Sequence, residues 1–392
     1  MKKGLLLVTD HRFFKHKGVI YDNYVFNYSF FKDYLEVFDS ITVIARVANL
    51  NNIKSDYQQA SGKYVEFIAV KDIRGIKWLL FNDKFLKNSQ IDLSGFSAIC
   101  FRIPSALAFG VWKTNKKTFG RPHMFEFIGD PKEALINEND NFFKKKVYSF
   151  IGSLMQYRMK LITKSAVCGS YVSFNHLQNK YPVKDEVQTE VISSIRLNKK
   201  YIRDKLPSIN TQEINIIHVG SFVFVKNHNF LIEFFKLLKD ENFKVNLTLL
   251  GDGALIEESK CKAEQLGLQE DISFKGHITG FDNIIKYLDS NNVFILPSFS
   301  EGMPRALIEA MSRGLICFGS DRGGISELLE KDYLFEPTKP EIFFKNFKEI
   351  ISNKELIEKS RKRNLQLATG FEQNLLTSKR KKILNILKSK TI

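Results

Sequence analysis

The second half of the chain alternates short apolar runs with longer amphipathic segments, and this alternation restricts its fold more than any other feature. Each apolar run has the length of a buried strand, and each segment between runs has apolar residues at helical spacing. Strand–helix–strand units of this kind build a parallel sheet. The predicted strands are 214–219, 245–250, 272–274, 293–296 and 315–319, and the predicted helices are 229–238, 256–266, 283–289, 306–313 and 325–329.

The first half shows the same alternation less regularly. The predicted strands there are 5–8, 40–45, 64–70, 98–102 and 124–128, with a helix at 24–38. The polar stretch 197–213 contains a proline and little apolar periodicity, which predicts a linker. We therefore expect an α/β fold of two doubly wound, Rossmann-like domains that face a central cleft. They are an N-terminal domain, 1–200, on which a helix at about 372–392 packs back, and a C-terminal domain, 201–371.

Charge and cysteine content narrow the function only in part. The 392 residues carry a formal net charge of +16, which suits a nucleic acid, an anionic membrane, a phosphorylated substrate or a generally basic composition. The four cysteines are far apart, each in or beside an apolar segment, so we expect buried free thiols rather than a metal site or disulfides. No run reaches the roughly 18 apolar residues of a membrane-spanning helix. No cofactor is expected.

Residues 293–330, VFILPSFSEGMPRALIEAMSRGLICFGSDRGGISELLE, carry the chemistry. A buried strand leads through a loop to Pro304, a residue that suits the first turn of a helix. The first amides of that helix have no intrahelical partners, so together with the helix dipole they form an anion site. Glu301 precedes this site and Glu309 follows it. Gly323 and Gly324 would let the backbone approach an anion closely.

Two carboxylates on either side of an anion site fit a nucleotide sugar, because its diphosphate lies between hydroxyl-bearing rings. Upstream, 216–226 reads IIHVGSFVFVK, which offers Gly220, Ser221 and Lys226 to the diphosphate. The loop at 274–280, FKGHITG, would place Gly276 and His277 near the nucleobase.

These motifs resemble the donor site of glycosyltransferase family 4, retaining enzymes of the GT-B fold. The resemblance implies that Glu301 binds hydroxyls of the transferred sugar, Glu309 binds the ribose and Lys226 neutralises the diphosphate. Ser221 stands where the family more often has an arginine, and Arg305 could supply that charge. In the first half, Gly18 matches a glycine loop near the donor phosphates, and Asp130 follows the strand where relatives often carry a histidine. The catalytic candidates are Glu301, Lys226 and Asp130, and the donor-binding candidates are Gly18, Gly220, Ser221, Lys226, Gly276, His277, Glu301, Gly302, Met303, Pro304, Arg305, Ala306 and Glu309, with no metal ligands.

The implied reaction transfers a hexose or N-acetylhexosamine from a nucleoside-diphosphate sugar to a sugar or lipid-linked sugar, as in cell-surface polysaccharide biosynthesis. Two stretches, 142–162 and 378–390, mix basic with aromatic or aliphatic residues. They fit either helices packed on their own domain or contacts with an anionic membrane. We expect a cytoplasmic protein without a nucleic-acid partner. If the two stretches contact a membrane, the protein is peripheral on the inner face of the cell membrane. Two alternatives stay open: a sugar-nucleotide epimerase of the same fold, and a non-catalytic protein that binds polyanions or nucleotide sugars.

Overall fold

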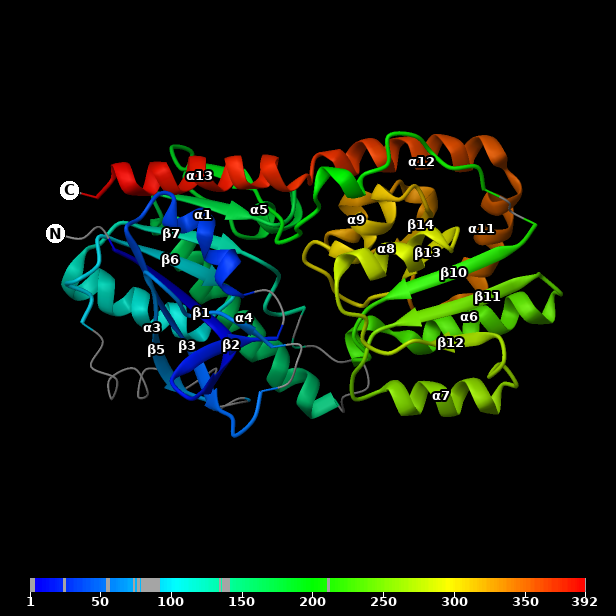
Figure 1. The fold of residues 1–392 in the computed structure, drawn as a ribbon, viewed down its shortest axis with the longest axis horizontal. Coiled ribbons are helices and arrows are strands. Elements are labelled where there is room, and N and C mark those ends of the chain that lie inside the picture. Colours follow the sequence, from blue (N-terminus) through cyan, green and yellow to red (C-terminus); the bar gives the residue numbers. More distant parts are fainter. Residues whose placement is uncertain are drawn as a thin grey trace. The chain divides into compact units, whose positions relative to one another are not determined.

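Two separate β-sheets organise the chain in this computed structural model (Figure 1). The structure describes residues 4–23, 26–53, 57–72, 75, 78, 92–133, 135, 142–209 and 212–391. The N-terminal unit comprises Met1–Ile192 together with Leu376–Ile392, and the C-terminal unit comprises Ser193–Leu375. The predicted boundary, at 200/201, lies a few residues further along the chain than the start of this second unit.

The N-terminal unit contains a sheet in which a parallel series, β5-β3-β1-β6-β7-β8-β9, is extended beside β1 by the antiparallel β2 and β4. Its strands are β1 (Gly4–His16), β2 (Val19–Asp22), β3 (Ser40–Asn49), β4 (Gln58–Gln59), β5 (Val65–Lys71), β6 (Ala98–Ile103), β7 (His123–Phe127), β8 (Cys168–Tyr171) and β9 (Gln188–Val191). Its helices are η1 (Tyr28–Phe31), α1 (Lys32–Leu35), α3 (Ala106–Thr114), η2 (Asn115–Phe119), α4 (Phe142–Ser165), α5 (His176–Lys180) and most of α13 (Gln373–Ser389).

The last helix, α13, completes the core of this unit. Its buried Ile383, Leu384 and Leu387 join one apolar cluster with Leu5 and Phe31. A network of buried polar side chains also fixes the position of this helix. It comprises an ion pair of Arg380 with Asp33, at 2.7 Å, and contacts of Glu126 with Tyr34 and Arg102. Burying these charges is tolerable because each has a partner.

The first strand differs most from the prediction. Instead of ending at Val8, β1 continues to His16 and turns back into β2 through Lys17 and Gly18, both with positive φ. Such a turn fits the twist of a two-stranded hairpin. The predicted helix at 24–38 is reduced to the short η1 and α1, and residues 24–25 lie outside the described residues.

The C-terminal unit has a parallel sheet in the order β12-β11-β10-β13-β14-β15. Helices α9 and α12 pack together, and so do α6 and α11. Figure 1 shows α12 and α9 above the strands and α7 below them. Its strands are β10 (Ile214–Val219), β11 (Val245–Leu250), β12 (Ile272–Phe274), β13 (Val293–Leu296), β14 (Ile316–Ser320) and β15 (Leu334–Phe335). Its helices are η3 (Lys199–Tyr201), η4 (Phe224–Lys226), α6 (His228–Asp240), α7 (Ile256–Gln265), α8 (Phe281–Asp289), α9 (Arg305–Ser312), α10 (Ile325–Leu328), η5 (Lys331–Tyr333), α11 (Pro340–Ser352) and α12 (Lys354–Thr369).

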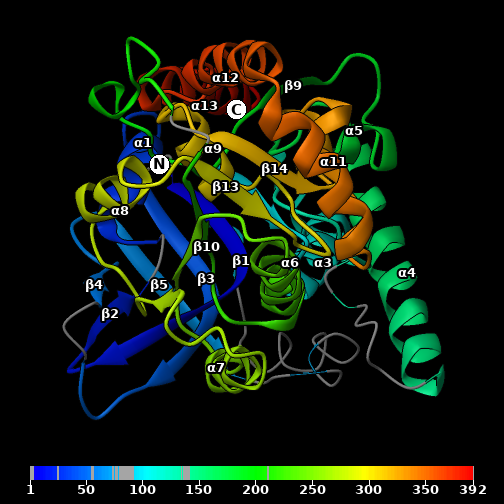
Figure 2. The same ribbon diagram turned by 90° about the vertical axis from the view of Figure 1, so that its right-hand side faces the viewer.

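Aromatic packing holds one face of this second sheet. Phe234 of α6 lies 4.5 Å from Phe343 of α11, and Phe230 stacks on Phe335 at 4.9 Å. Such ring pairs add to the stabilisation from buried apolar area. Figure 2 shows α6 and α11 beside the strands of this unit from a second direction.

The cysteine prediction needs one correction. All four thiols are free, but Cys261 is exposed, whereas Cys100, Cys168 and Cys317 are buried. Cys261 lies on α7 between Lys260 and Lys262, so it belongs to the polar side of an amphipathic helix rather than to the core.

Candidate functional site

The strand order of the C-terminal sheet reverses between β10 and β13, and this reversal defines the site. Strands β10, β11 and β12 run outward on one side of this point, and β13, β14 and β15 on the other. In an open parallel sheet, the loops that leave the carboxyl ends of the strands at such a switch point flank a crevice that binds ligands. Here these loops are 220–227, after β10, and 297–304, after β13.

Backbone hydrogen bonds join the loops at this edge into one platform. Each bond links a loop to the neighbouring strand end or loop, so their relative positions are set by the sheet itself. The bonds run from the N–H of Gly220 to the oxygen of Leu250 at 2.9 Å, Gly251 to Gly276 at 2.8 Å, Phe299 to Val225 at 2.8 Å, and Gly324 to Glu301 at 3.1 Å.

Two glycines permit the tightest of these approaches. A Cβ added to Gly324 would lie 1.9 Å from the carbonyl oxygen of Gly302. A Cβ on Gly323, whose φ is +50°, would lie 2.1 Å from the carbonyl oxygen of Glu301. Any side chain here would push back the loop that carries Glu301, which is the structural reason for the glycine pair.

Lys226 and Glu301 meet across the switch point. The Nζ of Lys226 forms an ion pair with Oε1 of Glu301, and the hydroxyl of Ser298 donates to the same oxygen at 2.8 Å. Both charged side chains are largely buried, at 23% and 12% exposed. The cation predicted for the diphosphate and the carboxylate predicted for the sugar are thus adjacent. Ser298 was not predicted; a hydroxyl three residues before Glu301 in the same loop was its only sequence signal.

Glu309 lies on α9, just beyond the start of that helix. Pro304 was predicted in the first turn of this helix, but it is the N-cap residue, one position before the first turn. No side chain caps this helix start. The carboxylate of Glu309 makes no hydrogen bond to another side chain of the described residues. Burial raises its pKa to about 7, although nearby Arg305 opposes the shift. A partly buried carboxylate without donors of its own can accept hydrogen bonds from ligand hydroxyls.

The other predicted donor residues occupy the same edge. Gly220, Gly276, Gly302, Arg305 and Ala306 are half-buried, Ser221 and His277 are exposed, and Met303 and Pro304 are buried. Ser221 leads into the loop beside Gly220, while His277 lies next to Gly276, which bonds Gly251. All the C-terminal candidates therefore border one surface of this unit.

Comparison with known proteins agrees with this geometry. Residues 199–366 match the model of the family "Glycosyl transferases group 1". This match covers most of the C-terminal unit. Protein CapJ of Staphylococcus aureus is 28% identical over 98% of this chain and 96% of its own length. The capsular polysaccharide biosynthesis glycosyltransferase CapH of the same species is 30% identical over 44% of this chain and 48% of its own length.

Solved structures confirm the predicted GT-B fold. A sucrose-phosphate synthase from Thermosynechococcus elongatus matches with a TM-score of 0.70 at 15% identity, over 99% of this chain and all of the other. HepE of Anabaena, in complex with UDP and glucose, matches with a TM-score of 0.64 at 14% identity over the same shares. At these identities the likeness concerns the fold alone.

The two candidates in the N-terminal unit have surroundings that differ from the prediction. Gly18 lies in the exposed turn of the β1–β2 hairpin and not in a strand-to-helix loop. The Asp130 carboxylate is buried and accepts hydrogen bonds from the amides of Lys132 and Glu133 and from the hydroxyl of Tyr181. Burial would raise the pKa of Asp130, but these hydrogen bonds and the charge of Lys180 lower it overall. Its acceptor positions are used within the unit, which argues against a contact with substrate.

Two neutral histidines lie beneath the loop after β10. His218 and His228 are almost fully buried, with ring centroids 4.9 Å apart, and His228 stacks on Phe222 at 3.8 Å. Nδ1 of His218 contacts the Ile295 carbonyl oxygen at 2.9 Å. Burial lowers the pKa of His218 to about 4 and that of His228 to about 2. The two rings therefore pack as uncharged groups against the loop that follows β10.

We expect the free energy of unfolding to fall as the pH drops below 6.5. The unfolded chain then protonates both histidines, whereas the folded unit keeps them neutral down to the lowered pKa values, so the unfolded state gains. In that range each histidine lowers the free energy of unfolding by about 1.4 kcal/mol per pH unit. Urea unfolding at pH 6.5 and 5.0 measures the loss. His228→Phe should lose roughly 2 kcal/mol less than the wild type, and exposed His277→Gln should match the wild type; equal acid sensitivity in His228→Phe would contradict a neutral His228.

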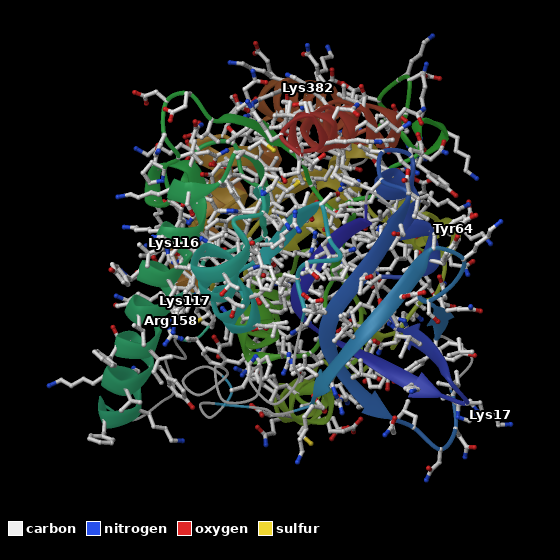
Figure 3. All side chains as sticks on the ribbon, turned by 90° about the vertical axis from the view of Figure 1, so that its left-hand side faces the viewer. Lys17, Tyr64, Lys116, Lys117, Arg158 and Lys382 are labelled. Carbon is white, nitrogen blue, oxygen red and sulfur yellow. The ribbon has the colours of Figure 1, made fainter. Side chains whose placement is uncertain are left out.

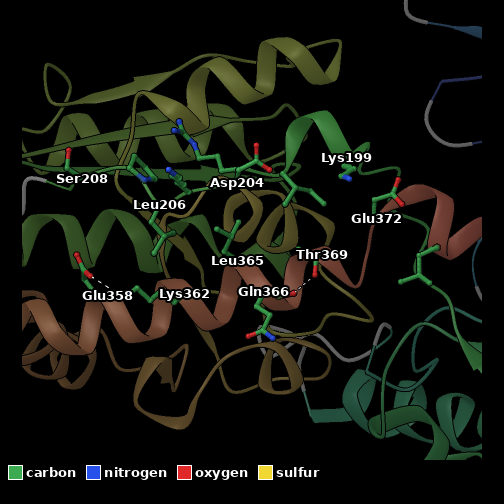
Figure 4. Close-up of a pocket in the computed structure, with 15 residues that line it drawn as sticks. Lys199, Asp204, Leu206, Ser208, Glu358, Lys362, Leu365, Gln366, Thr369 and Glu372 are labelled. Atoms are coloured by element: carbon green, nitrogen blue, oxygen red, sulfur yellow. Dashed lines mark hydrogen bonds and ion pairs between the residues drawn. The ribbon is translucent and has the colours of Figure 1, made fainter.

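A separate groove of about 1050 Å³ lies elsewhere in the C-terminal unit (Figure 4). The segment 199–208 and helix α12 form its walls, with Lys199, Asp204 and Glu358 among the lining side chains. None of the predicted donor residues lines it. The candidate site at the strand ends is therefore distinct from this groove.

None of the helices among the described residues is both long enough and apolar enough to cross a membrane.

Proposed function

We propose that the protein is a retaining glycosyltransferase of family 4 that moves a hexose or N-acetylhexosamine from a nucleoside-diphosphate sugar to a sugar or lipid-linked sugar. One observation carries this proposal: Lys226, Glu301 and the start of α9 meet where the C-terminal sheet reverses its strand order. The names of two relatives, CapH and HepE in complex with UDP, support capsular polysaccharide as the pathway and UDP as the carrier.

The site residues divide the work between binding and charge stabilisation. Glu309 accepts hydrogen bonds from the ribose, and Glu301 accepts them from the transferred sugar. As the glycosidic bond to phosphate breaks, the diphosphate gains negative charge, which Lys226 and the first amides of α9 stabilise. Donor binding requires Lys226 to exchange its ion pair with Glu301 for the diphosphate, which releases Glu301 for the sugar. Retention of the anomeric configuration rests on the family resemblance and is measured by NMR of the product.

The test is a thermal-shift screen of the full chain against UDP-, GDP- and ADP-sugars. A ligand that binds only the folded state raises the melting temperature, so the screen also identifies the base. The best donor is then incubated without acceptor. Release of nucleoside diphosphate supports a transferase, whereas conversion into another nucleotide sugar would support an epimerase. If no nucleotide sugar shifts the melting temperature, the proposed function is wrong.

We also propose that α4 rests on an anionic membrane at the inner face of the cell. Its Phe143, Phe150 and Tyr157 are 76%, 71% and 60% exposed and recur every seven residues, so they share one helix face. Exposed Lys146 and Lys160 lie three residues after Phe143 and Tyr157. Aromatic side chains flanked by lysines fit an anionic bilayer surface.

Basic residues extend this surface beyond the helix. Figure 3 shows Lys116, Lys117 and Arg158 on the flank of the N-terminal unit that carries α4. Arg158 lies over the ring of Phe109 at 5.0 Å, and Lys116 lies over Trp112 at 5.2 Å. These contacts keep the cationic groups at the surface.

Replacing Phe143, Phe150 and Tyr157 by serine should remove most binding to vesicles containing phosphatidylglycerol. Sedimentation with vesicles measures the bound fraction, because the loss of three large apolar side chains removes several kcal/mol of transfer free energy. Ile342→Ser, on α11, is the control, since Ile342 is 59% exposed. Undiminished sedimentation of the triple variant would contradict this membrane contact.

A further inference from the structure

Two phenylalanine rings join the same two loops of the C-terminal unit that the Lys226–Glu301 ion pair joins. Phe224 lies in the loop after β10, and Phe299 lies in the loop after β13. Their ring centroids are 5.1 Å apart and their planes differ by 20°, so the rings are stacked. Phe224 precedes Lys226 by two residues, and Phe299 precedes Glu301 by two. The ring pair and the ion pair are therefore adjacent links across one switch point.

Hydrogen bonds also connect these two loops. The Phe299 amide donates to the Val225 oxygen at 2.8 Å. The side-chain amide of Asn227 donates to the Pro297 oxygen at 3.3 Å. Both bonds have a backbone oxygen as acceptor, and the ring pair adds an apolar contact between side chains. A donor could displace the ion pair without breaking any of these other links.

The ring pair lies at the border of the core and not within it. Phe222, in the same loop, is fully buried and stacks on His228 at 3.8 Å. Phe224 and Phe299, in contrast, are only half-buried. Loss of a half-buried contact costs less folding free energy than a cavity in a packed core. We therefore expect this ring pair to affect the arrangement of the loops more than the stability of the unit.

The reach of Lys226 depends on the position of its loop. Its backbone lies in η4, which begins at Phe224. The stem of its side chain passes close to Gly220, because a Cβ built on Gly220 would lie 3.6 Å from Cδ of Lys226. In the proposed reaction, Lys226 leaves Glu301 to bind the diphosphate, and the ion pair then no longer joins the loops. Neither ring carries a charge, so donor binding does not require the ring pair to separate.

We propose that the Phe224–Phe299 stack positions Lys226 on the diphosphate after the ion pair with Glu301 has opened. The stack holds η4 beside the loop after β13, so the ammonium group stays where negative charge develops. Both phenylalanines are positioning residues, because they act through Lys226 and not on the substrate. This inference rests on the proposed function and adds to it two residues that the donor motifs do not include.

The experiment measures the affinity of the full chain for the nucleoside diphosphate of the donor with the largest thermal shift. This product carries the full charge of the leaving group, so its affinity reports the contact with Lys226. Phe224→Leu and Phe299→Leu each remove the stack but keep an apolar side chain. Each should weaken binding in isothermal titration by about 10-fold, part of the roughly 10- to 100-fold that a hydrogen bond to a charged group contributes. Phe299→Tyr keeps a ring and should bind as the wild type does.

A double-mutant cycle separates positioning from a general structural role. In the Lys226→Ala background, Phe224→Leu should change the affinity by less than about 2-fold, because the ring acts through the missing cation. A loss of the same size in both backgrounds would overturn the proposal, since the ring would then act on the ligand or on the fold independently of Lys226. A purely structural role would also lower the melting temperature of the empty protein.

Phe243→Leu is the matched control. Phe243 is also half-buried in the C-terminal unit and contacts another ring, that of Phe344 at 6.4 Å, but it precedes β11 at the opposite end of the strand from the site. Its affinity for the nucleoside diphosphate should equal that of the wild type. Wild-type affinity in Phe224→Leu and Phe299→Leu would overturn the positioning role and leave the proposed function intact. If the wild type bound no nucleotide sugar and no nucleoside diphosphate, the proposed function itself would be overturned.

Discussion

Lys226→Ala should lower the turnover number by about 100- to 1000-fold, the range seen when one preorganised group that stabilises a developing anion is removed. Lys226 is the cation that the loop after β10 holds against Glu301 at the switch point. Without it, the leaving diphosphate meets a largely buried carboxylate whose remaining hydrogen-bond donor among the described residues is the Ser298 hydroxyl. The missing cation and the unneutralised Glu301 carboxylate both disfavour the step in which negative charge moves to the phosphate. The turnover number should therefore fall more than the donor affinity.

The measurement compares turnover with the dissociation constant of the donor for the same preparations. Lys236→Ala is the control, because Lys236 belongs to a surface ion pair with Asp240 on neighbouring α6. Surface pairs of this kind contribute little. A Lys226→Ala enzyme with wild-type turnover would move the diphosphate contact to another residue.

Glu309→Ala should weaken donor binding by about 10- to 100-fold, because hydrogen bonds to a charged group contribute roughly 1.5–3 kcal/mol. Isothermal titration with the donor measures this loss. Glu258→Ala, an exposed glutamate on α7, is the control. Unchanged donor affinity in Glu309→Ala would remove this residue from the nucleotide site.

The same carboxylate predicts how donor affinity depends on pH. Burial raises the pKa of Glu309 to about 7 in the empty site, so many molecules are protonated at neutral pH. Hydroxyl donors favour the carboxylate, so the bound state has the lower pKa and binding releases a proton. Affinity should therefore rise as the pH increases toward 7 and level off above it. Glu309→Gln should lose this dependence.

The C-terminal sheet could be predicted because periodicity and strand length agree there. The strands at 214–219, 245–250, 272–274 and 293–296 have the predicted ends, and the fifth is displaced by one residue. In the first half, β8 and β9 are short and carry polar residues, so they gave no apolar signal. The β1–β2 hairpin escaped prediction because Lys17-Gly18 is a weaker turn signal than Asn-Gly.

The candidate site could also be predicted only in part. Local motifs identified the α9 loop and Lys226, because their residues are close in sequence. Pairing of Lys226 with Glu301 joins residues 75 positions apart and depends on β10 and β13 being neighbours. The surroundings of Asp130 were not predicted for the same reason: Tyr181 and Lys180, which contact its carboxylate, follow some 50 residues later.

The route of the chain through α13 limits how this protein can be divided. Ile383, Leu384 and Leu387 complete a core whose other members lie between Leu5 and Cys168, at least 215 positions earlier in the chain. A gene fragment that stops at residue 192 would expose that apolar surface, and a stop codon before residue 376 would do the same to an otherwise complete polypeptide. Split-gene expression would need the last helix supplied to the first fragment.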